Sequence, residues 1–360
     1  MLSEFDLIKQ YFKRPATVPG PGHLVLGIGD DCALLAPAPG MQLAVSSDML
    51  VEGRHFFAGA DPFMLGHKCL AVNLSDLAAM GARPLGFTLA LALERADPAW
   101  LAAFSAGLFA LADRHACTLI GGDTTRGPLN ICITVFGELA PGHALRRDAA
   151  LPGDDIWISG TLGDARLALA GMRGEAALAA DPLDADALKR AALRMHMPTP
   201  RVALGMALGM ALGMAPGMAP GTVPGMAPGA ANAGANDCSA RLANAAIDIS
   251  DGLVGDLAHI LEASNVGATL DADALPRGAV LATRSADLQR RFCAAGGDDY
   301  ELCFTAPAAN REAIVAAARG AHTAVARVGR IEAQAGLRLV DAHGAALDLG
   351  LAGFDHFAGT

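Results

Sequence analysis

Apolar runs of strand length alternate with helical segments along the first 140 residues of this chain. Asp61 and Asp97 are each followed by proline, and this pairing of an N-cap with a first-turn proline predicts two helices, ending near Gly81 and His115. The strands expected here span residues 43–45, 84–93, 118–120 and 131–139. Strands that alternate with helices of this length predict a mixed α/β domain.

The second half of the chain has the same character. A turn-rich stretch, 141–155, predicts a boundary between an N-terminal domain, 1–140, and a C-terminal α/β domain, 141–360. The expected strands span 155–159, 245–249 and 300–305, and the expected helices span 164–171, 186–194 and 251–264. Both halves are therefore predicted to be α/β (α+β mixed) units.

A low-complexity insert, 203–236, interrupts the second domain. From Leu204 it runs as tetrads of the types LGMA and PGMA. Its length and lack of charge suit a membrane span, but a proline at every fourth position from Pro216 to Pro228 is incompatible with a spanning helix. We expect a flexible insert and no membrane association.

Charge and cysteine usage exclude several classes of function. The net charge is −10, no basic run is present and only 5% of residues are aromatic, so a nucleic-acid partner is not expected. The seven cysteines show no C-x-x-C spacing, which argues against a zinc site and a disulfide framework. The first fourteen residues suggest an amphipathic helix rather than a signal peptide, and we expect a cytoplasmic protein.

Aspartates recur after glycine or serine near the expected strand ends. The motif GIGDDC places Asp30 and Asp31 side by side, an unfavourable arrangement unless water or a cation neutralises it. Asp48, Asp123 and Asp251 occur in SSDML, IGGDTT and DISDGL. Clustered carboxylates and hydroxyls suit Mg²⁺, and glycine turns let backbone N–H groups approach phosphate. Solvated turns, an N-cap role for Asp251 and a buried ion pair for Asp76 remain open alternatives.

Six motifs in order give a family resemblance: GIGDDCALL, SSDMLVEGRHF, KCLAVNLSDLAAMGARP, LIGGDTTRGP, AIDISDGL and GGDDYELCFT. Together they resemble the thiamine-monophosphate kinase family, within the superfamily of aminoimidazole ribonucleotide synthetase. The resemblance implies a two-domain fold whose N-terminal domain binds ATP and Mg²⁺ and dimerises, with its sheets forming a barrel. It also implies transfer of the ATP γ-phosphoryl group to thiamine monophosphate, the last step of thiamine diphosphate formation.

The resemblance also assigns residues. The positions matching the family's magnesium sites, with Ser46 as a neighbouring oxygen donor, are Asp30, Ser46, Ser47, Asp48, Asp76, Asp123, Asp248 and Asp251. Those matching ATP contacts are His115, Gly122, Asp123, Arg147 and Ser250, and those matching substrate contacts are His55, Asp298 and Phe354. His115 stands where the family has tyrosine, and Asp298 where it often has glutamate. Several Mg²⁺ ions and ATP as co-substrate are expected, with no general base.

Two further readings stay open. The first is another ATP-dependent enzyme of the superfamily, such as the cyclo-ligase, selenophosphate synthetase or the hydrogenase-maturation member. The hydrogenase-maturation member would end in cysteine, whereas this chain ends HFAGT. The second is a non-catalytic protein that binds Mg²⁺ or nucleotide, although every matched metal position here still carries an acid or a hydroxyl.

Overall fold

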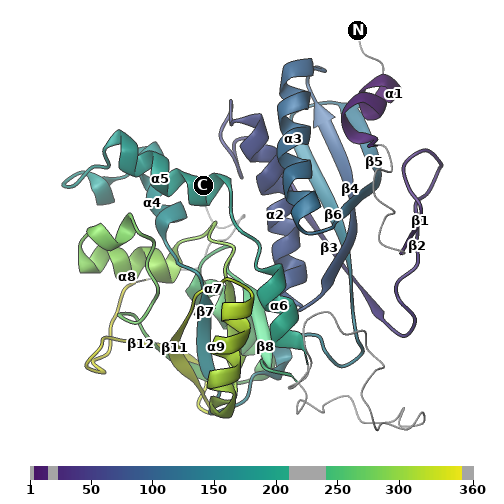
Figure 1. Ribbon diagram of the computed structural model, residues 1–360. Coiled ribbons are helices and arrows are strands. Elements are labelled where there is room, and N and C mark those ends of the chain that lie inside the picture. The colour runs from purple at the N-terminus through teal and green to yellow at the C-terminus, as the bar shows by residue number, and fades with distance from the viewer. Residues whose placement is uncertain (1–3, 15–22, 211–240, 351–360) are drawn as a thin grey trace. The chain divides into compact units, whose positions relative to one another are not determined.

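The computed structural model describes residues 4–14, 23–210 and 241–350 (Figure 1). Phe354 and most of the tetrad insert therefore lie outside the described residues. The chain divides into two compact units. Unit 1 comprises Met1–Leu77, Ala82–Leu139 and His196–Pro200, and unit 2 comprises Ala78–Gly81, Ala140–Met195 and Arg201–Thr360. Each contains helices and a sheet, so the prediction of mixed α/β structure is confirmed.

Unit 1 is built on a four-stranded sheet in the order β3-β6-β4-β5, in which only β4 and β5 are parallel. Its elements are α1 (Glu4–Leu7), the π-helix η1 (Ile8–Phe12), β1 (Leu24–Leu26), β2 (Leu34–Leu35), β3 (Gln42–Val51), α2 (Pro62–Ala79), β4 (Arg83–Leu93), α3 (Pro98–Arg114), β5 (Thr118–Arg126) and β6 (Asn130–Leu139). The predicted helix starts after Asp61 and Asp97 are confirmed, and both carboxylates accept backbone N–H groups of the first turn.

Helices α2 and α3 lie side by side along this sheet (Figure 1). They approach closely where each carries a glycine. A Cβ at Gly66 would lie 2.1 Å from the carbonyl oxygen of Phe104, and one at Gly107 would lie 1.9 Å from that of Phe63. No larger residue fits at either position without moving a helix.

Two predicted strand ends in unit 1 are wrong. Strand β3 continues through Ser47 and Asp48 to Val51, paired with β6 along its whole length. Strand β5 continues through Gly122 and Asp123 to Arg126, paired with β4. The polar residues do not end these strands, because their backbones stay in the ladder while their side chains occupy positions on the sheet surface. The aspartates at 48 and 123 are therefore strand residues.

Unit 2 contains a six-stranded sheet in the order β12-β9-β11-β7-β10-β8, antiparallel except for β12 and β9. Its main elements are the 3₁₀ turn η2 (Arg147–Ala149), β7 (Asp155–Ser159), α4 (Asp164–Arg173), α5 (Ala185–His196), α6 (Val202–Gly209), β8 (Ala245–Asp248), α7 (Leu253–Ser264), β9 (Gly267–Asp271), α8 (Ala286–Ala295), β10 (Leu302–Ala306), α9 (Arg311–Gly320), β11 (Val325–Glu332) and β12 (Gly336–Val340). The segments predicted from the sequence are confirmed within a few residues, and α8, α9, β9, β11 and β12 were not predicted.

The core of unit 2 joins one face of its sheet to the helices α4, α5, α7 and α8. Ile156 and Ile158 of β7 belong to this core together with Leu257 of α7. On the other side of β7, Trp157 stacks on Phe304 of β10 with ring centroids 6.3 Å apart. Successive side chains of β7 point to opposite faces of the sheet, and both faces are therefore buried at this strand.

Residues 204–209 of the insert belong to helix α6, which corrects the prediction of a flexible segment from residue 203 onward. In α6 the buried residues include Leu204, Gly205 and Leu208. A Cβ at Gly205 would lie 2.0 Å from the carbonyl oxygen of Ala78, which also belongs to unit 2. A repeat of four residues is close to one helical turn, so the glycines fall on one side of α6 and permit this contact.

Among the helices of the described ranges, none combines the length and apolar character needed to cross a lipid bilayer.

Candidate active site

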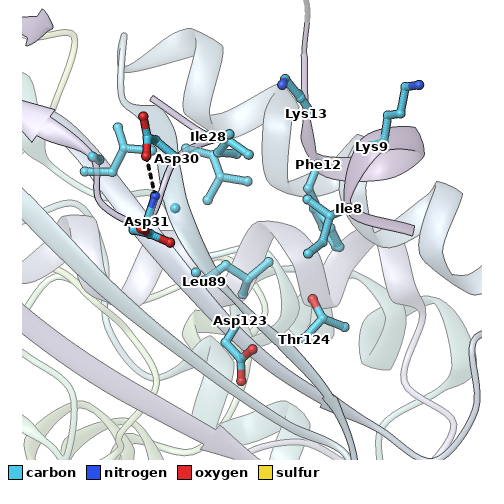
Figure 2. Close-up of a pocket in the computed structure, with 16 residues that line it drawn as sticks. Ile8, Lys9, Phe12, Lys13, Ile28, Asp30, Asp31, Leu89, Asp123 and Thr124 are labelled. Atoms are coloured by element: carbon cyan, nitrogen blue, oxygen red, sulfur yellow. Dashed lines mark hydrogen bonds between the residues drawn. The ribbon is translucent and has the colours of Figure 1, made fainter. Parts of the chain in front are cut away.

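A cavity of about 660 Å³ in unit 1 brings together Asp30, Gly122 and Asp123, three of the predicted site residues. Its walls come from η1, from the loop 28–33 and from strand β5, with Leu89 at its base (Figure 2). Asp30 and Asp123 are both exposed to solvent in this cavity. Among the lining residues, the carboxylate of Asp30 is a hard oxygen donor of the kind that Mg²⁺ prefers.

At two positions of the cavity, the backbone conformation requires glycine. Gly29 has φ +134° and Gly122 has φ +146°, in a region that L-residues rarely adopt. A Cβ at Gly122 would also lie 1.9 Å from the carbonyl oxygen of Leu89. The GIGDD loop is held locally, because the N–H of Asp31 donates to Oδ1 of Asp30 at 3.0 Å. The glycines therefore allow the backbone conformation that forms the wall of this pocket.

Lys9 and Lys13 line the same cavity and were not singled out from the sequence. Their spacing of four residues could have indicated that they act together, since residues at i and i+4 share one face of a helix. They introduce positive charge into a pocket whose other charged lining residues are all carboxylates.

A second polar group of unit 1 lies between β3 and α2. The hydroxyl of Ser46 donates to Oδ2 of Asp76 at 2.5 Å. The backbone N–H of Asp48 donates to Oδ1 of Asn73 at 3.0 Å, and Nδ2 of Asn73 donates to the carbonyl oxygen of Cys69 at 2.9 Å. Asn73 is fully buried and fixes the edge of β3 to α2. Asn73 was not predicted from the sequence, although the motif NLSD places it one turn before Asp76.

The side chains of Asp48 and Asp123 point to opposite faces of the unit 1 sheet. Asp48 and Gly122 belong to one row of paired residues across the four strands, and Asp123 is the next residue of β5. Neighbouring residues of a strand point to opposite faces, so the register places the side chains of Asp48 and Asp123 on opposite faces. Ser47 also faces away from Ser46, and its hydroxyl donates to the carbonyl oxygen of Ile133 at 3.1 Å. Within the described ranges, no three acidic, histidine or cysteine side chains are grouped as a metal site.

The two predicted ligand-binding histidines of unit 1 lie outside the cavity lining. Nδ1 of His55 accepts the N–H of Val51 at 3.0 Å, which closes the turn after β3. His115 caps the C-terminus of α3. Burial lowers the pKa of His115 to about 4, with the Arg114 charge adding to the effect. His115 is therefore neutral near pH 7.

In unit 2, two loops bring Ser250 and Asp298 together. The N–H of Asp298 donates to the carbonyl oxygen of Ser250 at 2.8 Å, and the N–H of Tyr300 donates to that of Ile249 at 2.8 Å. Asp298 and Tyr300 both have positive φ, +69° and +49°. Such conformations cost free energy and persist only where neighbouring contacts hold them. Asp251 follows Ser250 directly and is exposed.

Two buried aspartates that the sequence analysis did not assign support these loops. Asp256 accepts the N–H groups of Asp251 and Gly252 at 3.2 and 3.0 Å. Burial raises the pKa of Asp256 to about 6, and the nearby Asp251 charge adds to this. Asp299 accepts the N–H of Gly163 with both carboxyl oxygens, at 3.0 and 2.9 Å, and burial raises its pKa well above the usual value.

A buried ion cluster continues from the same loop. Glu301 is fully buried and pairs with Arg194 at 2.8 Å and with Arg201 at 2.5 Å. The hydroxyl of Ser159 donates to its other oxygen at 2.6 Å. Arg194 also donates to the carbonyl oxygen of Asp299 at 2.9 Å. The cluster links α5, β7 and the start of β10 at the base of the Asp298 loop.

The remaining two predicted residues of unit 2 occupy different places. Asp248 is buried at the end of β8, next to the Ser250 loop. Arg147 lies at the far end of α7, where the hydroxyl of Ser264 donates to its carbonyl oxygen at 2.7 Å. Since α7 begins just after Asp251, the backbone of Arg147 is not close to Ser250 within unit 2.

Comparison with known proteins gives matches along nearly the whole chain. Residues 29–139 match the family model "AIR synthase related protein, N-terminal domain", and residues 230–342 match "AIR synthase related protein, C-terminal domain". The thiamine-monophosphate kinases of Salmonella typhimurium and Escherichia coli K12 are each 41% identical to it, over 99% of this chain and 98% of theirs. The crystal structure of thiamine-monophosphate kinase from Stenotrophomonas maltophilia K279a has a TM-score of 0.74 and 44% identity, covering 90% of this chain and 92% of that one.

These matches confirm the two-domain aminoimidazole ribonucleotide synthetase-like fold and the resemblance drawn from the six motifs. The barrel of a dimer stays a prediction. At this identity and coverage, the chain belongs to the thiamine-monophosphate kinase family.

Proposed function

We propose that this protein transfers the γ-phosphoryl group of ATP to thiamine monophosphate. The observation that carries this proposal is the match, 41% identical over 98% of their length, to thiamine-monophosphate kinases. An oxygen of the monophosphate attacks the γ-phosphorus, the bond from that phosphorus to the β–γ bridging oxygen breaks, and ADP leaves with the electron pair. The products are thiamine diphosphate and ADP.

The acceptor does not need a general base. A phosphate monoester has a second pKa of about 6 and is largely ionised near neutral pH. The difficulty is the repulsion between two anionic phosphates, so catalysis depends on positioning and charge stabilisation. The chain's contribution is to hold the two phosphates in line.

Mg²⁺ suits the predicted donor set, which contains only carboxylates and hydroxyls. The residues that would hold it are Asp30, Ser46, Ser47, Asp48, Asp76, Asp123, Asp248 and Asp251. When bound, the metal neutralises phosphate charge. Asp30 and Asp123 at the cavity, and Asp76 beside Ser46, are the members whose surroundings support this role most directly.

The ATP and substrate contacts remain proposals. Gly122 and Ser250 would present backbone N–H groups to phosphate, Asp123 would act through metal and Arg147 through its charge. His115 would contribute as a neutral ring. His55, Asp298 and Phe354 would contact thiamine monophosphate, with Phe354 outside the described residues.

We also propose that residues 1–140 form the ATP- and Mg²⁺-binding, dimerising domain and 141–360 the second α/β domain. A homodimer is supported by the exposed face of β3. Leu43, Val45 and Met49 alternate along that edge strand and are 47%, 56% and 53% exposed. A row of exposed apolar residues on an open sheet is a surface that a second copy would cover.

A cytoplasmic location is part of the proposal. The cysteines of the described residues are free thiols, and Cys69, Cys117, Cys293 and Cys303 are buried. Free, buried thiols are typical of proteins that work in a reducing compartment.

A product assay tests the function. Protein, ATP and Mg²⁺ are incubated with thiamine monophosphate or with thiamine, and ADP and thiamine diphosphate are followed. We expect diphosphate only from the monophosphate, and its loss with EDTA and in Asp30→Asn and Asp123→Asn. Asp287→Asn, in an exposed pair with Arg291 on α8, is the matched control and should retain activity. ADP without diphosphate would assign another reaction of the superfamily, and no turnover would favour a binding protein.

A further inference from the structure

The cavity of unit 1 holds two of the four lysines in the whole chain, Lys9 and Lys13. Most other cations of this protein are arginines. Figure 2 shows the two lysines on one side of the pocket and Asp30 and Asp31 on the other. A lysine presents a compact charge with three rotatable donors, which suits phosphate oxygens approaching from several directions. Two lysines in one cavity indicate that it binds an anionic ligand.

The lysines are carried by a segment that is fixed to its unit. Phe12 of η1 is buried, and the N–H of Lys13 donates to the carbonyl oxygen of Ile8 at 2.8 Å in a π-type turn. Turns of this type occur often at functional sites. The next residue, Arg14, pairs with Asp113 of α3 at 2.6 Å and lies 4.7 Å from the ring centroid of Phe109. Lys13 is therefore held between two anchored residues.

The Lys13 ammonium lies against the GIGDD loop. Its Nζ is 3.1 Å from the position that a Cβ at residue 29 would occupy. Within residues 4–14, 23–210 and 241–350, neither Lys9 nor Lys13 forms an ion pair with a carboxylate, although Asp30 and Asp31 line the same cavity. Both lysines line the cavity and are exposed to solvent, so they are available to an anion.

We propose that Lys13, with Lys9 one turn before it, binds the β- and γ-phosphates of ATP in this cavity. The proposal rests on the proposed function and adds a nucleotide contact made by side-chain charge rather than by metal or backbone. Carboxylates alone would repel a polyphosphate, and two lysines beside them offset that repulsion.

Calorimetric titration with β,γ-methylene ATP and with AMP, both in Mg²⁺, tests this contact. Loss of a charged hydrogen bond is worth about 1.5–3 kcal/mol, so Lys13→Met should bind the ATP analogue about 10- to 100-fold more weakly. AMP, which lacks the β- and γ-phosphates, should bind within about twofold of wild type. Lys13→Arg should recover most of the affinity because it restores the charge.

Lys189→Met is the matched control, since Lys189 is exposed on α5 in unit 2. It should bind both nucleotides like wild type. Added salt should weaken the binding of the ATP analogue more in wild type than in Lys13→Met, because one screened attraction is already missing.

Equal affinities of Lys13→Met and Lys189→Met for the ATP analogue would overturn the inference and leave the kinase proposal standing if diphosphate is still formed. Equal losses for the ATP analogue and AMP would also overturn it, since the effect would not belong to the distal phosphates. Failure of wild type to bind either nucleotide would overturn the inference and the proposed function together.

Discussion

Gly122 is the residue of the cavity with the strictest backbone requirement. It combines a φ of +146° with a neighbouring carbonyl oxygen that leaves no room for a Cβ. A glycine of this kind supports a close approach between the chain and its ligand, because the backbone itself forms the surface. A substitution at Gly122 therefore tests whether the pocket depends on the backbone conformation of β5.

Gly122→Ala should destabilise unit 1 by at least about 2 kcal/mol more than Gly53→Ala. Gly53 also has positive φ, +80°, but a Cβ there meets nothing within 4 Å, so the control isolates the steric contact from the backbone cost. Urea unfolding followed by the fluorescence of Trp100, in a Trp157→Phe background, reports on unit 1. Similar losses in the two variants would contradict the contact with Leu89.

His115 should make the stability of unit 1 depend on pH. Its pKa is lowered to about 4 in the folded chain, while the unfolded value is about 6.5. The unfolded state therefore binds more protons between these values, and stability falls as pH drops from about 6.5 to about 4.

Wild type should lose about 1 kcal/mol more unfolding free energy than His115→Tyr when the pH drops from 7 to 5. This figure is smaller than the full pKa shift implies, because the ring is only half-buried and solvent screens part of the effect. His259→Tyr, at an exposed position of α7, is the control and should keep the wild-type dependence. Denaturation midpoints at the two pH values measure the difference. An unchanged pH dependence in His115→Tyr would show that other groups, such as the buried His67, account for it.

The sequence predicted residues whose own chemistry marks them, such as Asp30 and Asp123, and both line the cavity of unit 1. It did not identify Asn73 or Asp256, which act by holding another residue's backbone. That role depends on a partner distant in space or on the exact turn geometry, and a residue type alone does not encode it. Lys13 was not predicted as a site residue, because the GIGDD loop lies next to it only in the folded chain.

At the scale of elements, helix starts were predictable because the signal is local. An Asp-Pro pair caps its own helix, so α2 and α3 begin where expected. Strand ends were not predictable at Asp48 and Asp123, because cross-strand pairing outweighs the low strand preference of serine, glycine and aspartate. The strands β9, β11 and β12 were not predicted either, and they pair with each other and with β7.

The cluster around Glu301 joins several elements, so its loss should be felt across unit 2. Glu301→Gln leaves Arg194 and Arg201 without their shared carboxylate, and removal of one partner from a buried ion cluster costs about 3–5 kcal/mol. Asp287→Asn, in an exposed pair, should cost less than about 0.5 kcal/mol. The fluorescence of Trp157 in a Trp100→Phe background follows unit 2, and equal midpoints for the two variants would refute the assigned role of the cluster.

At the scale of the whole molecule, each unit contains one of the two tryptophans, so the units can be observed separately. The acidic residues that the family resemblance assigns to one reaction are divided between the units. The turn-rich stretch 141–155 predicts the same separation, because Asp123 and the assigned aspartates before it precede this stretch, whereas Asp248 and Asp251 follow it.

Self-association should depend on the open face of β3. Val45→Glu places a charge in the exposed apolar row, and we expect sedimentation to change from dimer to monomer, since burying an unpaired charge is unfavourable. Val315→Glu, at a 44% exposed valine of α9, introduces the same charge elsewhere and should leave the dimer intact. A dimer that persists in Val45→Glu would mean that this face is not the contact.

Helix α6 contains the first LGMA tetrad and the Leu-Gly that begins the second, and a third identical copy follows the second in the sequence. Each copy occupies a whole number of codons and about one helical turn. Loss of one LGMA copy from the gene would therefore preserve the reading frame and still leave Leu-Gly at the same distance from Arg201. The glycine facing Ala78 would be replaced by its own duplicate, so this part of the gene can change in length while the helix that packs into unit 2 keeps its sequence.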